Sequence, residues 1–194
     1  MYQFENELEI FKFSNFQINN MTTQELHDQV LNKLKAEFTD AVISSEVQYD
    51  FPVITVSKSK LYDILKFLKT NTDLGFEYLT TACGIHYPDV KGKELGMVYQ
   101  LHNMPKNLRI RIKCFTALSD AIYPTITTIW PSANWMEREA FDFFGLRFQG
   151  HPNLIRILNT EDFEGFPMRK EFPLEDQGRT DKDDRFFGRT PVNS

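Results

Sequence analysis

A short run of charged residues near position 140 is the part of this sequence best suited to chemistry. It holds three carboxylates and an arginine, and a histidine follows: Glu137, Arg138, Glu139, Asp142 and His151. Paired carboxylates can act as general acid and base in hydrolysis. Residues 137 and 139 lie about 200° apart around a helix and cannot face one substrate, whereas 139 and 142 can. A small hydrolase is one hypothesis; the favoured one is a charged helix flank that pairs with Arg138, Arg147 or Arg156.

No motif for a cofactor or a metal accompanies these residues. Iron–sulfur clusters need about four cysteine thiolates, and this chain has only Cys83 and Cys114, which we expect to be reduced core thiols. None of the nine glycines forms a GxGxxG motif or a P-loop. Cys83 with His86, and His151 by itself, do not assemble the three or four ligands of a zinc site. The sequence therefore predicts no catalytic, cofactor-binding or metal site in this chain.

A helix from about Trp135 to Phe144 must position the charged run. Asn134 and Glu137 are spaced as a capping box, and Gly145 is a left-handed C-terminal stop. The expected inward stripe is apolar and consists of Met136, Ala140, Phe143 and Phe144. Arg138 and Asp142 could pair on the surface, for about 0.3 kcal/mol. We expect instead that Arg138 and one carboxylate are buried in a network that anchors the helix to residues 145–158, with Arg147 or Arg156 as partner.

The rest of the chain predicts an α+β fold. Thr22 and Glu25 form a capping box for an amphipathic helix that reaches Phe38, and residues 60–69 form a second helix. The predicted strands are residues 41–49, 52–56, 76–83, 95–101 and 108–115, and EIFKF within residues 3–18 alternates as a short strand would. We expect a mixed or antiparallel sheet with two or three helices packed on it. The last strand has one basic face, with Arg109, Arg111 and Lys113 and no aromatic residues for stacking bases, so a solvated or partner-facing surface is favoured over a nucleic-acid groove.

The C-terminal residues differ in composition from the rest. The last 34 residues hold 15 charged residues, three prolines and five phenylalanines. Such a segment cannot build a core of its own, but its phenylalanines suit a segment that lies along a partner. We therefore divide the chain into a core domain, residues 1–160, and an extended, partner-wrapping tail, residues 161–194. The net charge of −5 argues against nucleic acid as the partner, and we expect no signal peptide and no transmembrane segment.

Several motifs in fixed order closely resemble one known family, the C subunit (the thirty-kilodalton subunit) of proton-translocating NADH-quinone oxidoreductase, respiratory complex I. The resemblance covers roughly residues 60 to 175. Its strongest motifs are Glu137-Arg138-Glu139, Asp142-Phe143-Phe144, Gly150-His151-Pro152, Arg156-Ile157-Leu158, Glu164-Gly165 and Arg169-Lys170. Ile155 and Phe166 depart from the family pattern, which has arginine and histidine at these positions in many members. The resemblance also favours a short helix at residues 124–130.

The resemblance implies a noncatalytic subunit of the hydrophilic arm that holds the D subunit, which carries the quinone site, and the cluster-bearing subunits in register. FMN and the Fe–S clusters would belong to those partners, and this chain would be peripheral, on the cytoplasmic side of the inner (cell) membrane, through the complex alone. The residues given a structural or partner-facing role are Glu137, Arg138, Glu139, Asp142, Gly145, Gly150, His151, Pro152, Arg156, Arg169 and Lys170. Alternatives are the equivalent subunit of a membrane-bound hydrogenase or related quinone oxidoreductase and, more distantly, the hydrolase.

Overall fold

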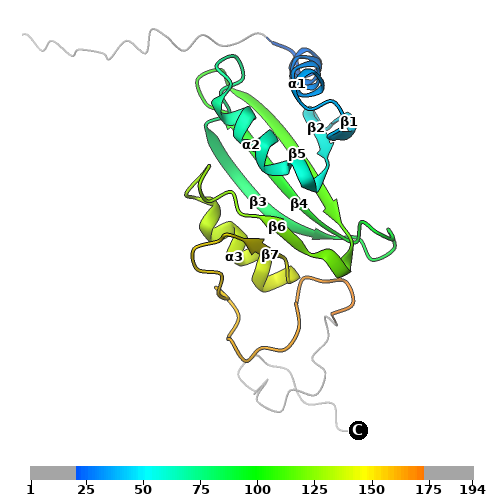
Figure 1. The fold of residues 1–194 in the computed structure, drawn as a ribbon, viewed down its shortest axis with the longest axis vertical. Coiled ribbons are helices and arrows are strands. Elements are labelled where there is room, and N and C mark those ends of the chain that lie inside the picture. Colours follow the sequence, from blue (N-terminus) through cyan, green and yellow to red (C-terminus); the bar gives the residue numbers. More distant parts are fainter. Residues whose placement is uncertain (1–20, 173–194) are drawn as a thin grey trace, which may run out of the picture.

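A five-stranded mixed sheet forms the centre of the protein, whose residues 21–172 are described by a computed structural model (Figure 1). Across the sheet the strands are β1 (Val42–Gln48), β2 (Phe51–Val56), β5 (Leu108–Thr116), β4 (Leu95–Asn103) and β3 (Tyr78–His86). Within this sheet, β2 and β5 are parallel and the other neighbouring strands are antiparallel. The α+β class with a mixed sheet is confirmed, whereas the strand expected within residues 3–18 and the tail beyond Phe172 lie outside the described residues.

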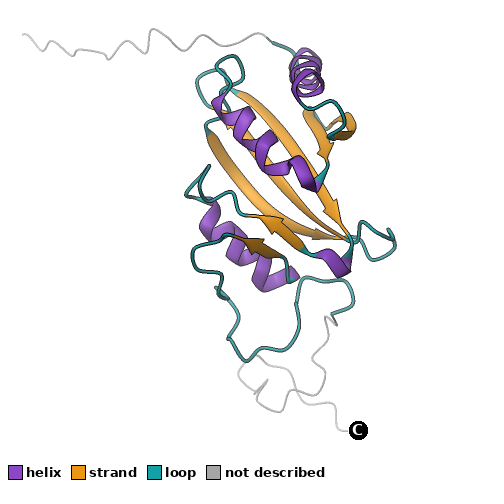
Figure 2. Ribbon diagram, viewed as in Figure 1, coloured by secondary structure: helices purple, strands orange, loops and turns teal. Residues whose placement is uncertain are grey.

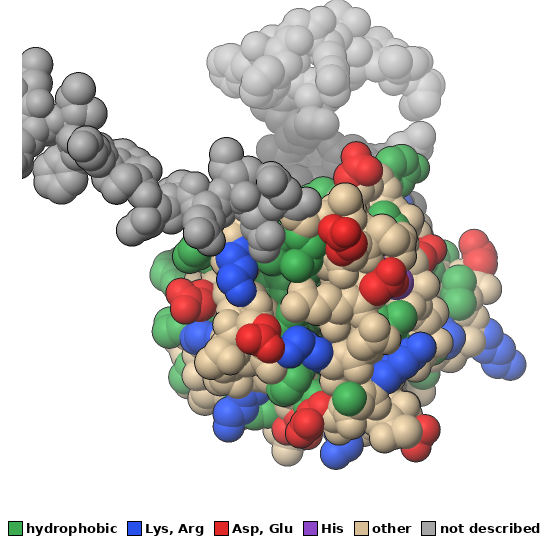
Figure 3. Space-filling model, turned by 90° about the horizontal axis from the view of Figure 1, so that it is seen from above, with side chains coloured by type: hydrophobic (Ala, Val, Ile, Leu, Met, Phe, Trp, Pro, Cys, Tyr) green, Lys and Arg blue, Asp and Glu red, His purple; other side chains and the backbone are tan. Residues whose placement is uncertain are grey.

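Two helices contribute to the core of this sheet, as their sequence periodicity predicted. Helix α1 (Thr23–Glu37) begins with the expected capping box between Thr22 and Glu25. Helix α2 (Leu61–Thr70) lies over the sheet (Figure 2) and buries four aliphatic residues, Leu61, Ile64, Leu65 and Leu68. These side chains share one core cluster with alternate residues of the central strands, including Tyr99 and Ile112. At the end of the molecule where α1 lies, acidic and basic side chains are interspersed (Figure 3).

Helix α3 (Ala133–Phe144), which carries the charged run, packs along the sheet edge formed by β3 (Figure 1). The Ala82 N–H of β3 donates to Met136 Sδ over 3.2 Å, so the helix supplies an acceptor to the edge strand. Gly84 lets the two elements approach closely, because a Cβ at this position would lie 2.4 Å from Cδ2 of Phe144. The sequence of β3 therefore determines how near α3 can come.

We expect Gly84→Ala to lower the free energy of unfolding by about 1 to 3 kcal/mol, since the added methyl group forces α3 away from β3. Chemical denaturation of the full chain measures the change. Hydrogen exchange should show loss of protection at the Ala82 amide, whose acceptor Met136 moves with the helix. Adding Phe144→Leu creates room and should recover part of the loss; a double variant less stable than Gly84→Ala would contradict the steric explanation.

A second, two-stranded parallel sheet flanks α3 and consists of β6 (Ile122–Pro124) and β7 (Arg147–Gln149). The short helix expected at residues 124–130 is wrong. The chain leaves β6 and forms a turn in which the Trp130 N–H donates to the Ile126 carbonyl. The Ile126 N–H donates to the carboxylate of Glu137, so a side chain of α3 binds the start of this turn.

The two cysteines differ in their surroundings. Cys114 is buried in the core, as expected, but Cys83 is exposed, so the prediction of a core thiol is wrong there. Cys83 pairs with Val98, which belongs to the sheet face opposite Tyr99 and the core. Among residues 21–172, no helix is both long and apolar enough to cross a membrane.

Candidate functional site

The charged helix begins earlier than its sequence suggested. It starts at Ala133 after Ser132, and no side chain caps it. The capping box proposed for Asn134 and Glu137 is wrong, because the Glu137 carboxylate points away from the helix start and binds a neighbouring segment. The C-terminal stop is as predicted: Gly145 has a φ of +72° and its N–H donates to the Phe141 carbonyl.

The inward face of α3 is more polar than the predicted apolar stripe. Glu137 and Asp142 are both fully buried, whereas Phe143 and Phe144 are only partly buried. Of the four stripe residues, Ala140 alone is classed as buried. A buried charge is tolerated only with partners, so the hydrogen bonds around these two carboxylates determine how the site is built.

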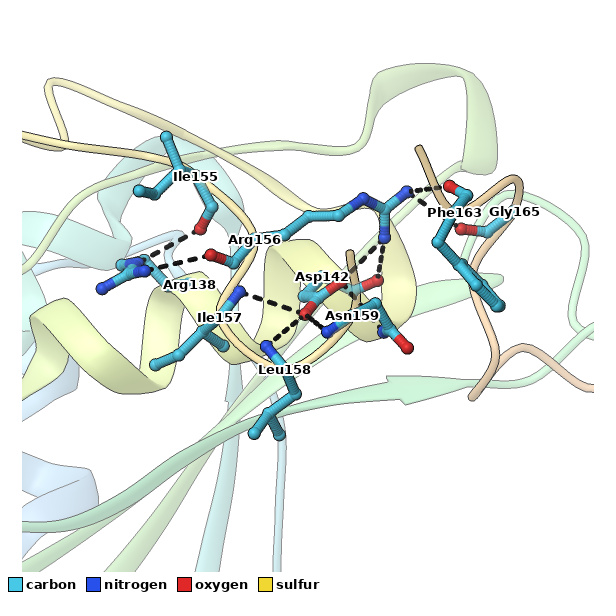
Figure 4. A network of polar contacts seen from close by, with 9 residues as sticks. All are labelled: Arg138, Asp142, Ile155, Arg156, Ile157, Leu158, Asn159, Phe163 and Gly165. Carbon is cyan, nitrogen blue, oxygen red and sulfur yellow. Dashed lines mark hydrogen bonds and ion pairs between the residues drawn. The ribbon is translucent and has the colours of Figure 1, made fainter. Parts of the chain in front are cut away.

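Asp142 accepts five hydrogen bonds from one loop (Figure 4). Its Oδ2 accepts from the backbone N–H groups of Ile157, Leu158 and Asn159, at 3.1, 2.9 and 2.9 Å. Its Oδ1 accepts from Nη1 of Arg156 at 2.7 Å and from Nδ2 of Asn159 at 3.0 Å. Burial raises the pKa of this carboxyl, but the hydrogen bonds from Asn159, Leu158 and Arg156 outweigh burial and hold the pKa well below its ordinary value.

Arg156 extends this network toward the following segment. Its Nη1 also reaches the backbone carbonyl of Asp142, and its Nη2 donates to the carbonyls of Phe163 and Gly165 at 3.0 and 3.2 Å (Figure 4). The rings of Phe163 and Phe166 lie 5.8 and 5.7 Å from the guanidinium. Arg156 was one of the two partners expected for a buried carboxylate, and it binds Asp142.

Arg138 joins the same network through backbone atoms. Its Nε and Nη2 donate to the carbonyls of Ile155 and Arg156 at 3.1 and 3.0 Å (Figure 4). It is half-buried and makes no ion pair with Asp142, so the surface pair considered for these two residues does not form. Arg147, the other expected partner, is exposed on β7. The predicted anchoring of α3 through a buried carboxylate and Arg156 is confirmed, but the expectation that Arg138 is buried is wrong, because its guanidinium binds backbone carbonyls at a half-buried position.

The two remaining basic signature residues lie where the chain returns to α3. Arg169 donates from Nε to the Phe144 carbonyl at 2.8 Å and stacks 4.3 Å from the ring of Phe166. A Cβ at Gly145 would meet that ring at 2.5 Å, so only glycine fits there. The Lys170 N–H donates to Nδ1 of His86, and its side chain is exposed.

The second buried carboxylate, Glu137, binds the turn after β6. Its Oε2 accepts from the Thr125 hydroxyl at 2.6 Å and its Oε1 accepts from the Ile126 N–H at 2.7 Å. Burial raises the pKa of Glu137 to about 7, although both hydrogen bonds favour the charged form. The protein thus holds a carboxyl group that takes up a proton near neutral pH.

His151 lies beside Glu137 and binds backbone atoms on both sides of its ring. The Asn153 N–H donates to Nδ1 of His151, so the ring proton resides on Nε2, which donates to the Asn134 carbonyl at 3.1 Å. Both ring nitrogens thus have a backbone partner, and Nε2 lies 3.9 Å from Oε2 of Glu137. His151 joins the loop after Gly150, which has a φ of +84°, to the start of α3, and the neighbouring Pro152 is exposed.

This geometry does not support the hydrolase hypothesis. Asp142 is fully buried with both oxygens bound, whereas Glu139 is exposed, so the two cannot act together on a substrate. Cys83 and His86 occupy one strand, Cys83 exposed and His86 buried. Within residues 21–172, no three His, Cys, Asp or Glu side chains are grouped so that they could hold a metal ion.

Sequence reasoning missed two residues of the site, Thr125 and Asn159. Each binds a buried carboxylate that lies more than ten positions away in the chain. A threonine before a β-branched run and an asparagine after Leu158 carry no local signal for such contacts. Only the folded chain brings them together.

The fold and site define an α+β domain in which one helix, placed on a sheet edge, binds two loops through buried carboxylates. Residues 54–178 match the family described as respiratory-chain NADH dehydrogenase, 30 Kd subunit. The NADH-quinone oxidoreductase C subunit of Hyphomonas neptunium is 37% identical over 154 residues, 79% of this chain and 75% of that protein. The C subunit numbered 2 of Rhizobium etli is 39% identical over 155 residues, 79% and 80% of the two chains.

Two solved structures share the fold. A trypsin-resistant fragment of Nqo5 aligns with a TM-score of 0.57 and 26% identity, over 66% of this chain and 98% of the fragment. A chain of a membrane-bound sulfane sulfur reductase, an archaeal respiratory membrane complex, aligns with a TM-score of 0.64 and 23% identity, over 82% and 97% of the two chains. The chain belongs to the C-subunit family, the 30 kDa subunit family, of NADH-quinone oxidoreductase, complex I.

Proposed function

We propose that this chain is a noncatalytic assembly subunit of the hydrophilic arm of a proton-translocating NADH-quinone oxidoreductase, where it holds the quinone-site D subunit and the cluster-bearing subunits in register. The proposal rests on the surroundings of Asp142. Both oxygens of its carboxylate accept hydrogen bonds from this chain, five in all. A carboxylate so bound cannot accept a substrate proton, but it fixes the loop at residues 155–159 rigidly to α3.

Helix α3, the loop at residues 155–159 and the returning segment at residue 168 present large apolar side chains to the surface. Trp135 is 64% exposed, Leu158 69%, Met168 55% and Ile155 43%. Exposed apolar groups held by a rigid network are suited to bind another subunit without a large loss of conformational entropy. We propose that these residues contact the quinone-site subunit. We also propose that residues 161–194 lie along a partner; from Glu161 to Phe172 the chain forms turns and neither helix nor strand.

FMN and the Fe–S clusters belong to the partner subunits in this proposal, and the chain reaches the cytoplasmic face of the membrane only through the complex. We therefore expect the purified full chain to be colourless and not to bind NADH, because its sequence has no cluster-binding or nucleotide-binding motif and no group of metal ligands occurs within residues 21–172. Absorption spectroscopy tests for bound chromophores, and calorimetry tests for binding of NADH. Stoichiometric flavin, iron or nickel in the refolded pure protein would contradict it.

We expect Arg138→Ala to reduce the amount of assembled complex several-fold while leaving quinone reduction per flavin near normal, because Arg138 holds the carbonyls of residues 155 and 156 and touches no reacting group. Purification from membranes through a tag on this chain gives both quantities. Arg147→Ala is the matched control, since Arg147 is an exposed arginine of the same region.

Full assembly of Arg138→Ala with much slower turnover would overturn the scaffold role and indicate a direct part in quinone or proton chemistry. The same purification tests the electron donor of the assembly. A flavoprotein and cluster-bearing subunits that co-purify with the wild-type chain agree with the proposal. A nickel-bearing subunit in their place would assign the chain to a hydrogenase.

A further inference from the structure

The sheet has a second surface, opposite the core, on which the three cations of β5 lie. Leu108, Ile110, Ile112 and Cys114 belong to the core, so the residues between them face away from it. Arg109 lies opposite His102, Arg111 opposite Gln100 and Lys113 opposite Val98 on β4. The basic face predicted from the alternation of β5 is confirmed. We call it the basic face.

Aromatic residues from three strands join these cations, contrary to the expectation that none would. The ring of Phe51 on β2 lies 5.3 Å from the Arg111 guanidinium. Tyr78 on β3 lies on the basic face because it is paired with His102, and Phe115 continues the alternation of β5. Phe51 and Tyr78 come from neighbouring strands, which the sequence of β5 cannot reveal, whereas Phe115 lies in the predicted strand itself and was overlooked.

The cations of the basic face have no anionic partner in the described part of the chain. None of the ion pairs between residues 21 and 172 includes Arg109, Arg111 or Lys113. Arg111 is half-buried, and within the described residues its Nε has no hydrogen-bond acceptor and Lys113 binds the neutral Gln48. Three cations that have no anionic partner among residues 21–172, on a chain of net charge −5, are suited to a negatively charged partner.

A groove of about 340 Å³ lies on this face beside Arg109. Its lining includes Phe51, Met104 and Tyr78, and the last two are 52% and 51% exposed. An aromatic or aliphatic side chain can enter this groove while a carboxylate next to it binds the exposed Arg109 guanidinium. The groove therefore prefers an acidic segment that also carries apolar side chains.

We propose that the basic face binds an extended acidic segment of another subunit of the complex, with carboxylates at alternate positions and an apolar side chain in the groove. The cations of β5 recur every second residue, about 7 Å apart, which is the spacing of same-side residues in an extended chain. Arg109, Arg111 and Lys113 can thus meet three successive carboxylates of such a segment. This inference rests on the proposed function, because it requires the chain to be part of an assembly.

A photo-crosslinking residue at Thr80 tests the proposal in the assembled complex. Thr80 is exposed and lines the groove. We expect p-benzoylphenylalanine at this position to cross-link to a segment of another subunit that has Asp or Glu at alternate positions. The same residue at the exposed Leu118 is the control and should not give this product. The double variant Arg109→Glu/Lys113→Glu should lower the yield at least ten-fold, whereas Lys91→Glu/Lys93→Glu, two exposed lysines of the β3–β4 turn, should not.

Native Cys83 provides a second measurement that needs no variant. It is exposed on the basic face in the free chain, so N-ethylmaleimide should modify it at least ten-fold more slowly in the complex. Equal rates, or a Thr80 cross-link to residues 1–20 of the same chain, would overturn the inference. So would binding of a single-stranded oligonucleotide to the free chain that Arg109→Glu abolishes. If the wild-type chain purifies without any other subunit, the proposed function fails; an intact complex without the cross-link refutes this inference alone.

Discussion

We expect Asp142→Ala to lower the free energy of unfolding by about 3 to 5 kcal/mol, because it leaves the Arg156 guanidinium and three backbone N–H groups without their acceptor in a largely buried place. Urea denaturation of the full chain at pH 7 measures the loss. Glu139→Ala, three positions away on the same helix and exposed, is the matched control and should change stability by less than about 0.5 kcal/mol.

Removing Arg156 as well tests whether its unpaired charge causes the loss of stability in Asp142→Ala. In the double variant Asp142→Ala/Arg156→Met no unpaired charge remains, so it should lose less than the sum of the two single variants. The Asp142 pKa is depressed in the folded chain, so its stabilisation is present above the ordinary value of 3.8 and is lost as the pH falls. The difference in free energy of unfolding between wild type and Asp142→Ala should therefore become smaller as the pH is lowered below 3.8. Strict additivity, or a difference independent of pH, would contradict the network.

The second large effect concerns Glu137, whose substitution by glutamine should make the protein more stable at alkaline pH. A folded pKa raised from 4.5 to about 7 means that the folded state holds a proton which the unfolded chain has lost between these values. The contribution of Glu137 to the free energy of unfolding is therefore fully present below pH 4.5 and is lost as the pH rises through 7, a change of about 3 kcal/mol. Glutamine keeps the shape, accepts from the Ile126 N–H and donates to the Thr125 hydroxyl.

The free energy of unfolding of Glu137→Gln, relative to that of wild type, should thus rise by about 3 kcal/mol between pH 4.5 and pH 8. Thermal unfolding of both proteins across this range gives the difference directly. Glu139→Gln, an exposed glutamate of the same helix, should show a flat difference. If the stability difference between Glu137→Gln and wild type is also independent of pH, or falls as the pH rises, the prediction is wrong. Glu137 would then be ionised throughout this range, because its hydrogen bonds would outweigh the effect of burial on its pKa.

The sequence by itself determined the elements whose stability is local. The capping box at Thr22, the four-residue periodicity of α1 and α2, and the alternation of β5 depend on neighbours within one turn or one strand, so their positions followed from the chain alone. The ordered motifs from Glu137 to Lys170 likewise indicated the family without any knowledge of the fold.

Only the tertiary structure decided which charges are buried. Glu137 and Asp142 look like surface residues of an amphipathic helix, since burying a carboxylate is unfavourable unless donors surround it. Those donors come from Thr125, Ile126 and residues 156–159, and their positions depend on how β6, α3 and the following loop pack together. The exposure of Cys83 has the same origin: pairing with β4 places it on the face away from the core, and no residue next to it in the chain determines that face.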